Sequence, residues 1–384
     1  MRPALTPPTR GCLGRLRSRV TLGVAASTAV VGLVASPPRA VAAPTVATVI
    51  DLGTLPGGTA SIAFAANDTG QVVGYSDAPN QALHAVLWSH TGFRSFAITD
   101  LGTLPGGSTS SADAVNRDGL VAGLADTAEG RLHGAVWKAA GSGVLRATDL
   151  GTLPGGIESA AYALNDAGFV AGSSSSSTRD YQAVLWRPNA GGSYSVTELA
   201  ALPGDTVSGA SAIAPDGVVA GYSGKLDGSS HAVLWRPNAG SYGVTDLGTL
   251  PGKNSSSATG ITPDGVVAGS SGPFENGHAV VWLPNTAGSY SITDLGALPG
   301  DRISTATGIS TNGHVAGNSA AVPAERHAVL WTPTGSGSFD ITSLGPFPGD
   351  DFSETFGLNA GGLVAGDSRR SEGSEHAVVW ILTG

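Results

Sequence analysis

Six histidines recur in this sequence, each four residues before a tryptophan. Imidazole is a common metal ligand, so a repeated histidine could belong to a ring of metal sites. A repeated acid opens most copies of a second segment, Asp-Leu-Gly-Thr-Leu-Pro-Gly, and two such acids could cooperate in hydrolysis if they lay close together. The histidines are His84, His133, His231, His278, His327 and His376, and Gln182 takes the place in the remaining copy.

Whether these groups can meet depends on the elements that carry them. The acidic segments begin at Asp51, Asp100, Asp149, Glu198, Asp246, Asp294 and Ser343, and between them lie Trp88, Trp137, Trp186, Trp235, Trp282, Trp331 and Trp380. Successive tryptophans are 49, 49, 49, 47, 49 and 49 residues apart. A period near fifty residues is typical of the four short strands of one propeller blade.

The second copy shows how the strands follow one another. Residues 112–115 and 120–123 are apolar and flank an Asp-Gly turn, which predicts a β-hairpin. A nine-residue polar loop, 124–132, leads to a third strand at 133–137, and a fourth follows at 145–148. The Leu-Pro-Gly-Gly segment cannot lie inside a strand, because proline lacks a donor and glycine favours turns, so we expect it to link one sheet to the next.

The two ends of the repeat complement each other. The last copy stops four residues after Trp380 and lacks a fourth strand, whereas residues 45–50 form a fourth strand with no copy before it. Pairing them would close the ring and leave no sheet edge unpaired. The sequence therefore predicts an all-β, seven-bladed β-propeller with four-stranded blades over residues 43–384, closed by its N-terminal strand.

This architecture favours structural roles for the repeated groups. Each histidine would lie in a different blade, too far from the others to share one ion at about 2 Å. We expect each to hydrogen-bond a carbonyl or its blade's aspartate, and the tryptophans to form the core. The repeated acids would likewise lie farther apart than the roughly 5–10 Å of a cooperating carboxylate pair.

Function is then expected where the copies differ. The residue after Leu-Pro-Gly is glycine in three copies, at positions 58, 107 and 156, and is then Asp205, Lys253, Asp301 and Asp350. With Arg302 and Asp351 these residues predict a charged arc on the loop face that could bind a ligand. Calcium is a possible ligand of this arc, and no other cofactor is expected.

Residues 1–42 have the features of a secretory signal peptide. Five arginines precede an apolar run at 20–35, and small residues at 40–42 suit cleavage after Ala42. An uncleaved anchor helix is the alternative, but the run is shorter than the roughly 20 residues that span a bilayer. Cys12 would leave with the signal.

Cleavage would also make the chain strongly acidic. It would remove six arginines and no acid, so 29 acidic residues would face 14 basic ones, a net charge of −15. Such a surface disfavours nucleic acid and anionic membranes as partners. We expect a secreted monomer.

The repeated segments resemble the HAF family of bacterial extracellular repeats. The resemblance rests on Asp-Leu-Gly-Thr-Leu-Pro-Gly-Gly, Asn-x-x-Gly-x-Val-x-Gly and His-Ala-Val-Leu-Trp, and it covers residues 51–380, with valine in place of the family's phenylalanine. It implies a secreted repeat protein and assigns no general activity.

Familiar catalytic signatures are missing. The sequence has no Gly-x-Ser-x-Gly elbow, no phosphate-binding loop and no His-Glu-x-x-His. We therefore expect a secreted, non-catalytic module that binds a glycan or a protein through its loop face. The alternative is an extracellular polysaccharide hydrolase or lyase that uses the acidic arc.

Overall fold

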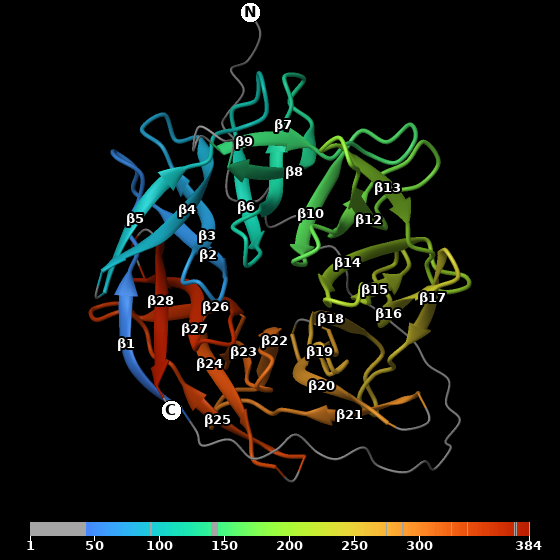
Figure 1. Ribbon diagram of the computed structural model, residues 1–384. Helices are drawn as coiled ribbons and strands as arrows, with labels where there is room; N and C mark the ends of the chain where they lie inside the picture. The colour runs from blue at the N-terminus through green and yellow to red at the C-terminus, as the bar shows by residue number, and fades with distance from the viewer. Residues whose placement is uncertain are drawn as a thin grey trace, which may run out of the picture.

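Seven four-stranded antiparallel sheets make up the computed structural model (Figure 1). It describes residues 44–383 apart from 93, 140–144, 274, 286–287, 324, 336, 372 and 374. The predicted signal peptide, 1–42, lies outside the described residues. Within the described part, no helix is long and apolar enough to cross a membrane.

The strands follow the predicted order within each blade. The first three blades consist of β2 (Ser61–Ala66), β3 (Val72–Asp77), β4 (Leu83–Gly92), β5 (Ser95–Asp100); β6 (Ser110–Val115), β7 (Val121–Asp126), β8 (Leu132–Ala139), β9 (Leu145–Asp149); and β10 (Ser159–Leu164), β11 (Val170–Ser174), β12 (Gln182–Pro188), β13 (Tyr194–Glu198). The next three consist of β14 (Val207–Ile213), β15 (Val219–Gly224), β16 (Ser230–Asn238), β17 (Ser241–Asp246); β18 (Ser256–Ile261), β19 (Val267–Ser271), β20 (His278–Pro284), β21 (Tyr290–Asp294); and β22 (Ile303–Ile309), β23 (Val315–Ala320), β24 (Arg326–Pro333), β25 (Phe339–Ser343). The seventh blade consists of β26 (Phe352–Leu358), β27 (Leu363–Arg369), β28 (Glu375–Thr383) and β1 (Thr45–Asp51).

The N-terminal strand closes the ring, as predicted. β1 pairs antiparallel with β28, which places Val46 opposite Leu382 and Ile50 opposite Val379. The first strand of every blade faces the hub, and the fourth lies at the circumference (Figure 1). The fold class predicted from the sequence is thus confirmed.

The core lies between neighbouring blades. All seven tryptophan side chains are fully buried. Trp235 of β16, for example, packs with Ala171 and Leu185 of the preceding blade and Val219 of its own. Burial of one tryptophan removes roughly 150–250 Å² from water, worth at most about 4–6 kcal/mol. The small side chains of the inner strands leave room for these rings to pack.

A buried serine joins each pair of neighbouring blades. Ser110 Oγ accepts the N–H of Ala85 at 2.8 Å and donates to the carbonyl of Gly102 at 2.8 Å. Because Ala85 lies in the preceding blade, the bond crosses the boundary between the two sheets. The serines at the equivalent positions accept the same kind of N–H: Ser61, Ser159, Ser208, Ser256, Ser304 and Ser353.

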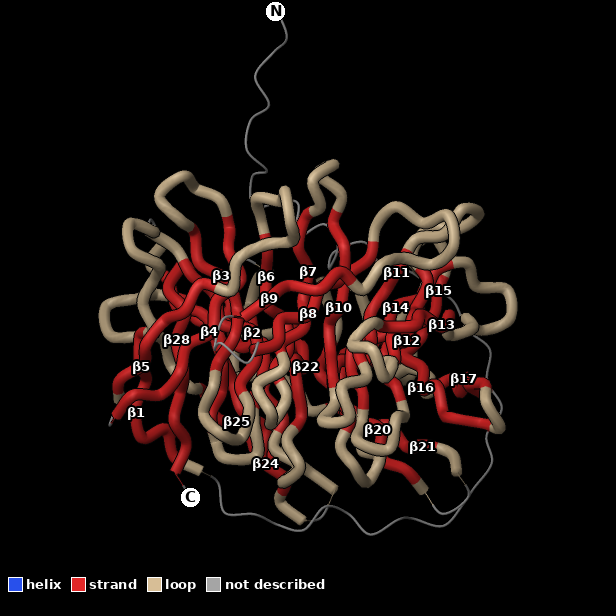
Figure 2. Tube along the Cα trace, turned by 45° about the horizontal axis from the view of Figure 1, so that its top comes forward, coloured by secondary structure: helices blue, strands red, loops and turns tan. Residues whose placement is uncertain are grey.

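Antiparallel order puts two kinds of connection on one side of the ring. The linkers between blades and the loops after β3, β7, β11 and β15 share a side, which we call the loop face (Figure 2). The hairpin turns between first and second strands lie on the other side, where Gly217 and Gly265 have φ values of 85° and 84°. Positive φ at these glycines is what the predicted Pro-Asp-Gly turns require.

One detail of the prediction is wrong. The long loop expected at 124–132 is only 127–131, because β7 and β8 both extend farther toward the loop face than their apolar runs suggest.

Candidate functional site

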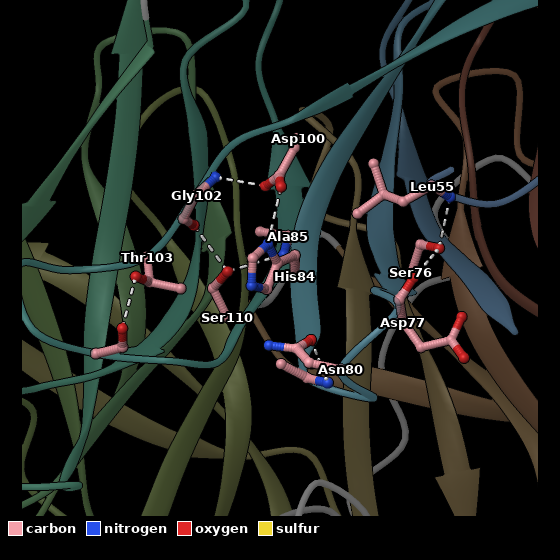
Figure 3. Close-up of polar contacts among 12 residues, drawn as sticks. Leu55, Ser76, Asp77, Asn80, His84, Ala85, Asp100, Gly102, Thr103 and Ser110 are labelled. Carbon is pink, nitrogen blue, oxygen red and sulfur yellow. Dashed lines mark hydrogen bonds and ion pairs between the residues drawn. The ribbon is translucent and has the colours of Figure 1, made fainter. Parts of the chain in front are cut away.

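Histidine and aspartate meet in pairs within the blades. In the first blade, His84 Nδ1 lies 2.8 Å from Asp100 Oδ2, while Asp100 Oδ1 accepts the N–H of Gly102 at 2.8 Å (Figure 3). The same arrangement joins His133 to Asp149, His231 to Asp246 and His278 to Asp294, at 2.7–2.8 Å. The aspartate thus fixes a turn and a neighbouring strand at once, which is a structural role.

One of these pairs shows the electrostatics clearly. The hydrogen bond to Asp246 raises the pKa of His231, against the opposing effect of burial. Burial alone would raise the pKa of Asp246, but hydrogen bonds from His231 and the Gly248 N–H bring it below its ordinary value. Both pKa shifts favour an ion pair between His231 and Asp246. Its hydrogen bonds connect two strands of the blade.

The sixth and third blades depart from this pattern. In the sixth blade Ser343 takes the place of the aspartate, and His327 Nδ1 lies 3.5 Å from Asp301 Oδ2 instead. In the third blade Gln182 Nε2 donates to the Thr206 carbonyl at 2.8 Å, and Arg179 pairs with Glu198 at 2.9 Å. Among the described residues, no group of three or more His, Cys, Asp or Glu side chains could hold a metal ion.

Three acids of the predicted arc are hydrogen-bonded within their own blades. Asp205, Asp301 and Asp350 each accept a hydrogen bond from a serine of their blade's second strand, at 2.7–2.8 Å. The side chains of Asp301 and Asp350 are 8% and 7% exposed. One oxygen of each carboxylate is thus bound to a strand of its own blade, and the side chains of Asp301 and Asp350 are largely removed from solvent.

In the first two blades, which have glycine after Leu-Pro-Gly, the second strand supplies the carboxylate that hydrogen-bonds the linker. In the first blade, the carboxylate of Asp77 at the end of β3 accepts the N–H groups of Thr59 and Ala60, at 2.6 and 2.8 Å. A Cβ at Gly58 would lie 2.2 Å from the Asp77 carbonyl oxygen, so only glycine fits there. Asp126 caps the second blade's linker in the same way. The copies therefore differ in where the carboxylate lies: it is on the second strand in the first and second blades, and on the linker in the blades of Asp205, Asp301 and Asp350.

The remaining arc residues also have local partners. Lys253 Nζ donates to the Asn276 carbonyl at 2.6 Å, and Arg302 donates to the Ala321 carbonyl at 3.5 Å. Asp351 accepts the hydroxyl of Ser371 at 2.6 Å, which lowers the pKa of this carboxyl. No hydrogen bond or ion pair joins any two of the six predicted ligand-binding residues within the described part of the chain.

A cleft on the loop face lies in the second blade, outside the predicted arc. It has a volume of about 620 Å³ and is bounded by the Leu-Pro linker, the 127–131 loop and the His133–Asp149 pair. Glu129 and Arg131 contribute charge, and Ile157 forms an apolar wall. Ile157 is 54% exposed, a large exposed fraction for an aliphatic side chain.

One feature of the sequence indicates this cleft, namely an aliphatic residue at position 157. The position of Ile157 is occupied by polar or charged residues in the other copies: Thr59, Ser108, Thr206, Asn254, Arg302 and Asp351. A lone isoleucine among them has no scaffold role that the others share. Leu226 and Val322, in later loops of the same face, are also exposed, at 72% and 40%.

Comparison with known proteins supports the fold. No protein-family model matches the sequence, and a search of curated proteins finds no match. The β-propeller domain of the Trilobed protease from Pyrococcus furiosus, which has an open velcro topology, is similar with a TM-score of 0.51 and 9% identity over 84% of this chain and 95% of that chain. Here β1 completes the last blade instead.

Two weaker structural likenesses carry no argument about function. A chain of the mitotic checkpoint complex has a TM-score of 0.47 and 12% identity, covering 94% of this chain and 99% of its own. Trypanosoma rangeli sialidase has a TM-score of 0.41 and 9% identity, covering 84% of this chain and 54% of its own. The likeness to the Trilobed protease domain shows the propeller fold, and the sheet order of this chain gives its seven four-stranded blades.

Proposed function

We propose that this chain is a secreted, non-catalytic binding module of the HAF repeat type, which takes an extracellular glycan or protein on its loop face. The observation that carries the proposal is the cleft beside Ile157, where an exposed aliphatic side chain lies next to Glu129 and Arg131. Apolar area rimmed by charged groups is typical of interaction sites. The signal peptide predicted at residues 1–42 supports an extracellular location.

The alternative, a polysaccharide hydrolase or lyase on the acidic arc, has less support. Asp205, Asp301 and Asp350 lie in three different blades, and each carboxylate is bound by a serine of its own blade. Turnover of a polysaccharide that Asp301→Ala abolishes without unfolding the protein would favour this alternative.

A binding screen tests the proposal directly. Purified protein is applied to glycan and cell-wall arrays and is used to capture proteins from a bacterial secretome. We expect at least one ligand whose affinity falls tenfold or more in Ile157→Asp, because the new carboxylate places charge on the apolar wall of the cleft. Leu226→Asp is the matched control, since Leu226 is an exposed aliphatic residue of the same face outside the cleft. Absence of any ligand would contradict the proposal, as would equal losses in both variants.

A further inference from the structure

Asparagine side chains join neighbouring blades on the side of the ring opposite the loop face. Each lies in the turn between the first and second strands of its blade. Asn67 Nδ2 donates to the Asn116 carbonyl of the next blade at 2.8 Å, and Asn116 Nδ2 donates to the Asn165 carbonyl at 3.3 Å. Asn165 donates in the same way to the Ala214 carbonyl at 3.2 Å, and Asn359 donates to the Asn67 carbonyl at 2.7 Å. A buried amide thus bridges four of the seven blade boundaries.

This series stops at the fourth and fifth blades, where Ala214 and Thr262 occupy the asparagine position. Alanine has no amide, and Thr262 Oγ1 donates to Asp264 and Val266 of its own turn. Among the described residues, the Thr262 carbonyl therefore lacks the amide donor that the equivalent carbonyls of the first four blades have.

A cavity of about 110 Å³ lies at the boundary between these two blades. It is lined by Ala214 and Val218 of the fourth blade and by Ile261 and Thr262 of the fifth. At the bridged boundaries the residues equivalent to Ala214 and Thr262 are joined by the asparagine bond, so the cavity takes the place of a missing amide. Its volume exceeds the roughly 30 Å³ of one water molecule and is below the roughly 300–1,000 Å³ of pockets for drug-sized ligands. A ligand about the size of one amino acid would fit.

Asp216 replaces only half of the missing amide. In the second blade, Asn116 Oδ1 accepts the N–H of Leu120 at 2.9 Å, while its Nδ2 group bridges to the next blade. In the fourth blade, Asp216 Oδ1 accepts the equivalent N–H, that of Val218, at 3.1 Å. A carboxylate has no N–H group, so Asp216 cannot donate to the Thr262 carbonyl. The boundary therefore lacks an N–H donor that a ligand could supply.

Charged groups of both signs line the same cavity. Arg236, Asp216 and Asp264 are exposed, so they are accessible from solvent. Arg236 Nη2 donates to Tyr290 Oη of the fifth blade at 2.6 Å, and its guanidinium makes no other hydrogen bond within the described part of the chain. A guanidinium binds carboxylates, and a carboxylate binds ammonium groups. The lining therefore suits a small zwitterion.

We propose that this cavity binds a free amino acid with a side-chain amide, L-asparagine or L-glutamine. The amide donates to the Thr262 carbonyl, as the asparagines do at the bridged boundaries. The α-carboxylate pairs with Arg236, and the α-ammonium group pairs with Asp216 or Asp264. The cavity lies on the opposite side of the ring from the Ile157 cleft, so this site is independent of the function proposed above.

Isothermal titration calorimetry with the purified chain tests this proposal. The probes are L-asparagine and L-glutamine, and we expect at least one to bind at concentrations up to about 10 mM. L-Aspartate and L-glutamate should bind at least tenfold more weakly, because a carboxylate in place of the amide cannot donate to the Thr262 carbonyl. N-Acetyl-L-asparagine amide keeps the side-chain amide without the two charges, and it should also bind at least tenfold more weakly.

Two variants connect the binding to this cavity. Ala214→Asn supplies the missing amide from the chain itself, so it should fill the cavity and lower the affinity at least tenfold. Arg236→Gln removes the guanidinium and should lower the affinity about tenfold or more. Ala167→Asn is the matched control, because Ala167 is exposed in the equivalent turn of the third blade and lies outside the cavity. It should leave the affinity unchanged.

Binding of an amide amino acid that both cavity variants weaken and Ala167→Asn leaves unchanged supports the proposal. Failure of both amides to bind overturns it, as does binding that a folded cavity variant leaves unchanged. If Ala214→Asn does not fold, the Arg236→Gln result alone decides. Equal affinity for the acids, or for the blocked amide, would contradict recognition of a free amino-acid amide. Ile157→Asp tests the loop face separately, so the loss of this site leaves the proposed binding function standing.

Discussion

At the scale of the residue, a buried acid in the last blade has a pKa that its surroundings change strongly. Asp367 of β27 is 2% exposed and lies opposite Glu354 of β26. Glu354 is ion-paired with Arg326 at 2.7 Å and Arg369 at 3.3 Å, whereas Asp367 Oδ1 has no hydrogen-bond partner among the described residues. Burial, and then the charges of Glu354 and Glu375, raise the pKa of Asp367 well above its ordinary value.

This residue predicts a pH dependence of stability. The unfolded chain loses the Asp367 proton near pH 4, and the folded chain loses it at higher pH. The contribution of Asp367 to the free energy of unfolding is therefore fully present below pH 4 and is lost as the pH rises through the pKa of the folded state. Asp367→Asn should therefore raise the free energy of unfolding at pH 7.5 by about 1–2 kcal/mol and have a smaller effect at pH 4. Urea unfolding at the two pH values measures this.

The chain offers a precedent and a control for that variant. Asn318 occupies the equivalent position in the sixth blade, where its side chain bonds Thr355 N and O at 2.8 and 3.3 Å. Asp351→Asn changes an exposed carboxyl whose pKa is lowered, so it should not raise the free energy of unfolding at pH 7.5. A destabilised Asp367→Asn at pH 7.5 would mean that the carboxylate is ionised and paired.

At the scale of the element, the blade is held by its tryptophan and by its boundary serine. Trp235 is fully buried among side chains of two blades, and its indole N–H donates to the Ala200 carbonyl at 2.7 Å. Ser208 closes the same boundary by accepting the N–H of Ala183 at 2.9 Å. Packing and hydrogen bonding therefore both stabilise the boundary between the third and fourth blades.

Removal of that tryptophan should be costly. Trp235→Ala should lower the free energy of unfolding by about 3–5 kcal/mol, since it leaves a large cavity and an unpaired carbonyl. Chemical denaturation followed by circular dichroism gives the value. Leu226→Ala in the same blade, at a side chain 72% exposed, should change it little. A loss below about 1 kcal/mol for Trp235→Ala would place the indole outside the core.

The sequence predicted these elements well because their landmarks repeat. Seven tryptophans at a near-constant spacing fix the blades, and an unpaired strand at 45–50 indicates the closure. The β-bulge in the first strand of each blade, such as the one between Ala63 and Ala65 of β2, was not predictable, because the small residues on its two sides give the same sequence pattern with or without the bulge. The role of Asp205 was hidden as well, because its partner Ser223 lies 18 residues away in another strand.

At the scale of the whole molecule, the closing boundary has the same bonds as the others. Ser61 accepts the Ala377 N–H at 3.0 Å, and His376 lies 3.3 Å from Asp51. On the side of the ring opposite the loop face, Asn359 Nδ2 donates to the Asn67 carbonyl at 2.7 Å, and Asn67 Nδ2 donates to the Asn116 carbonyl at 2.8 Å. The ring is therefore continuous across the junction of its two ends.

Deletion of residues 45–50 should open this ring. β28 would then expose an unpaired edge, and such edges promote aggregation. We expect a lower melting temperature and concentration-dependent aggregation, measured by differential scanning calorimetry and light scattering. A truncated chain that remains monomeric with an unchanged melting temperature would show that β1 contributes nothing to closure.

A disulfide across the closing pair tests the account most directly. Thr45 and Thr383 are register partners whose hydroxyls lie 3.3 Å apart, a geometry that a disulfide can span. In a Cys12→Ser background, Thr45→Cys with Thr383→Cys should oxidise to an intramolecular disulfide, seen as faster migration on a non-reducing gel. Free thiols after oxidation, or disulfides only between molecules, would contradict a ring closed by its first strand.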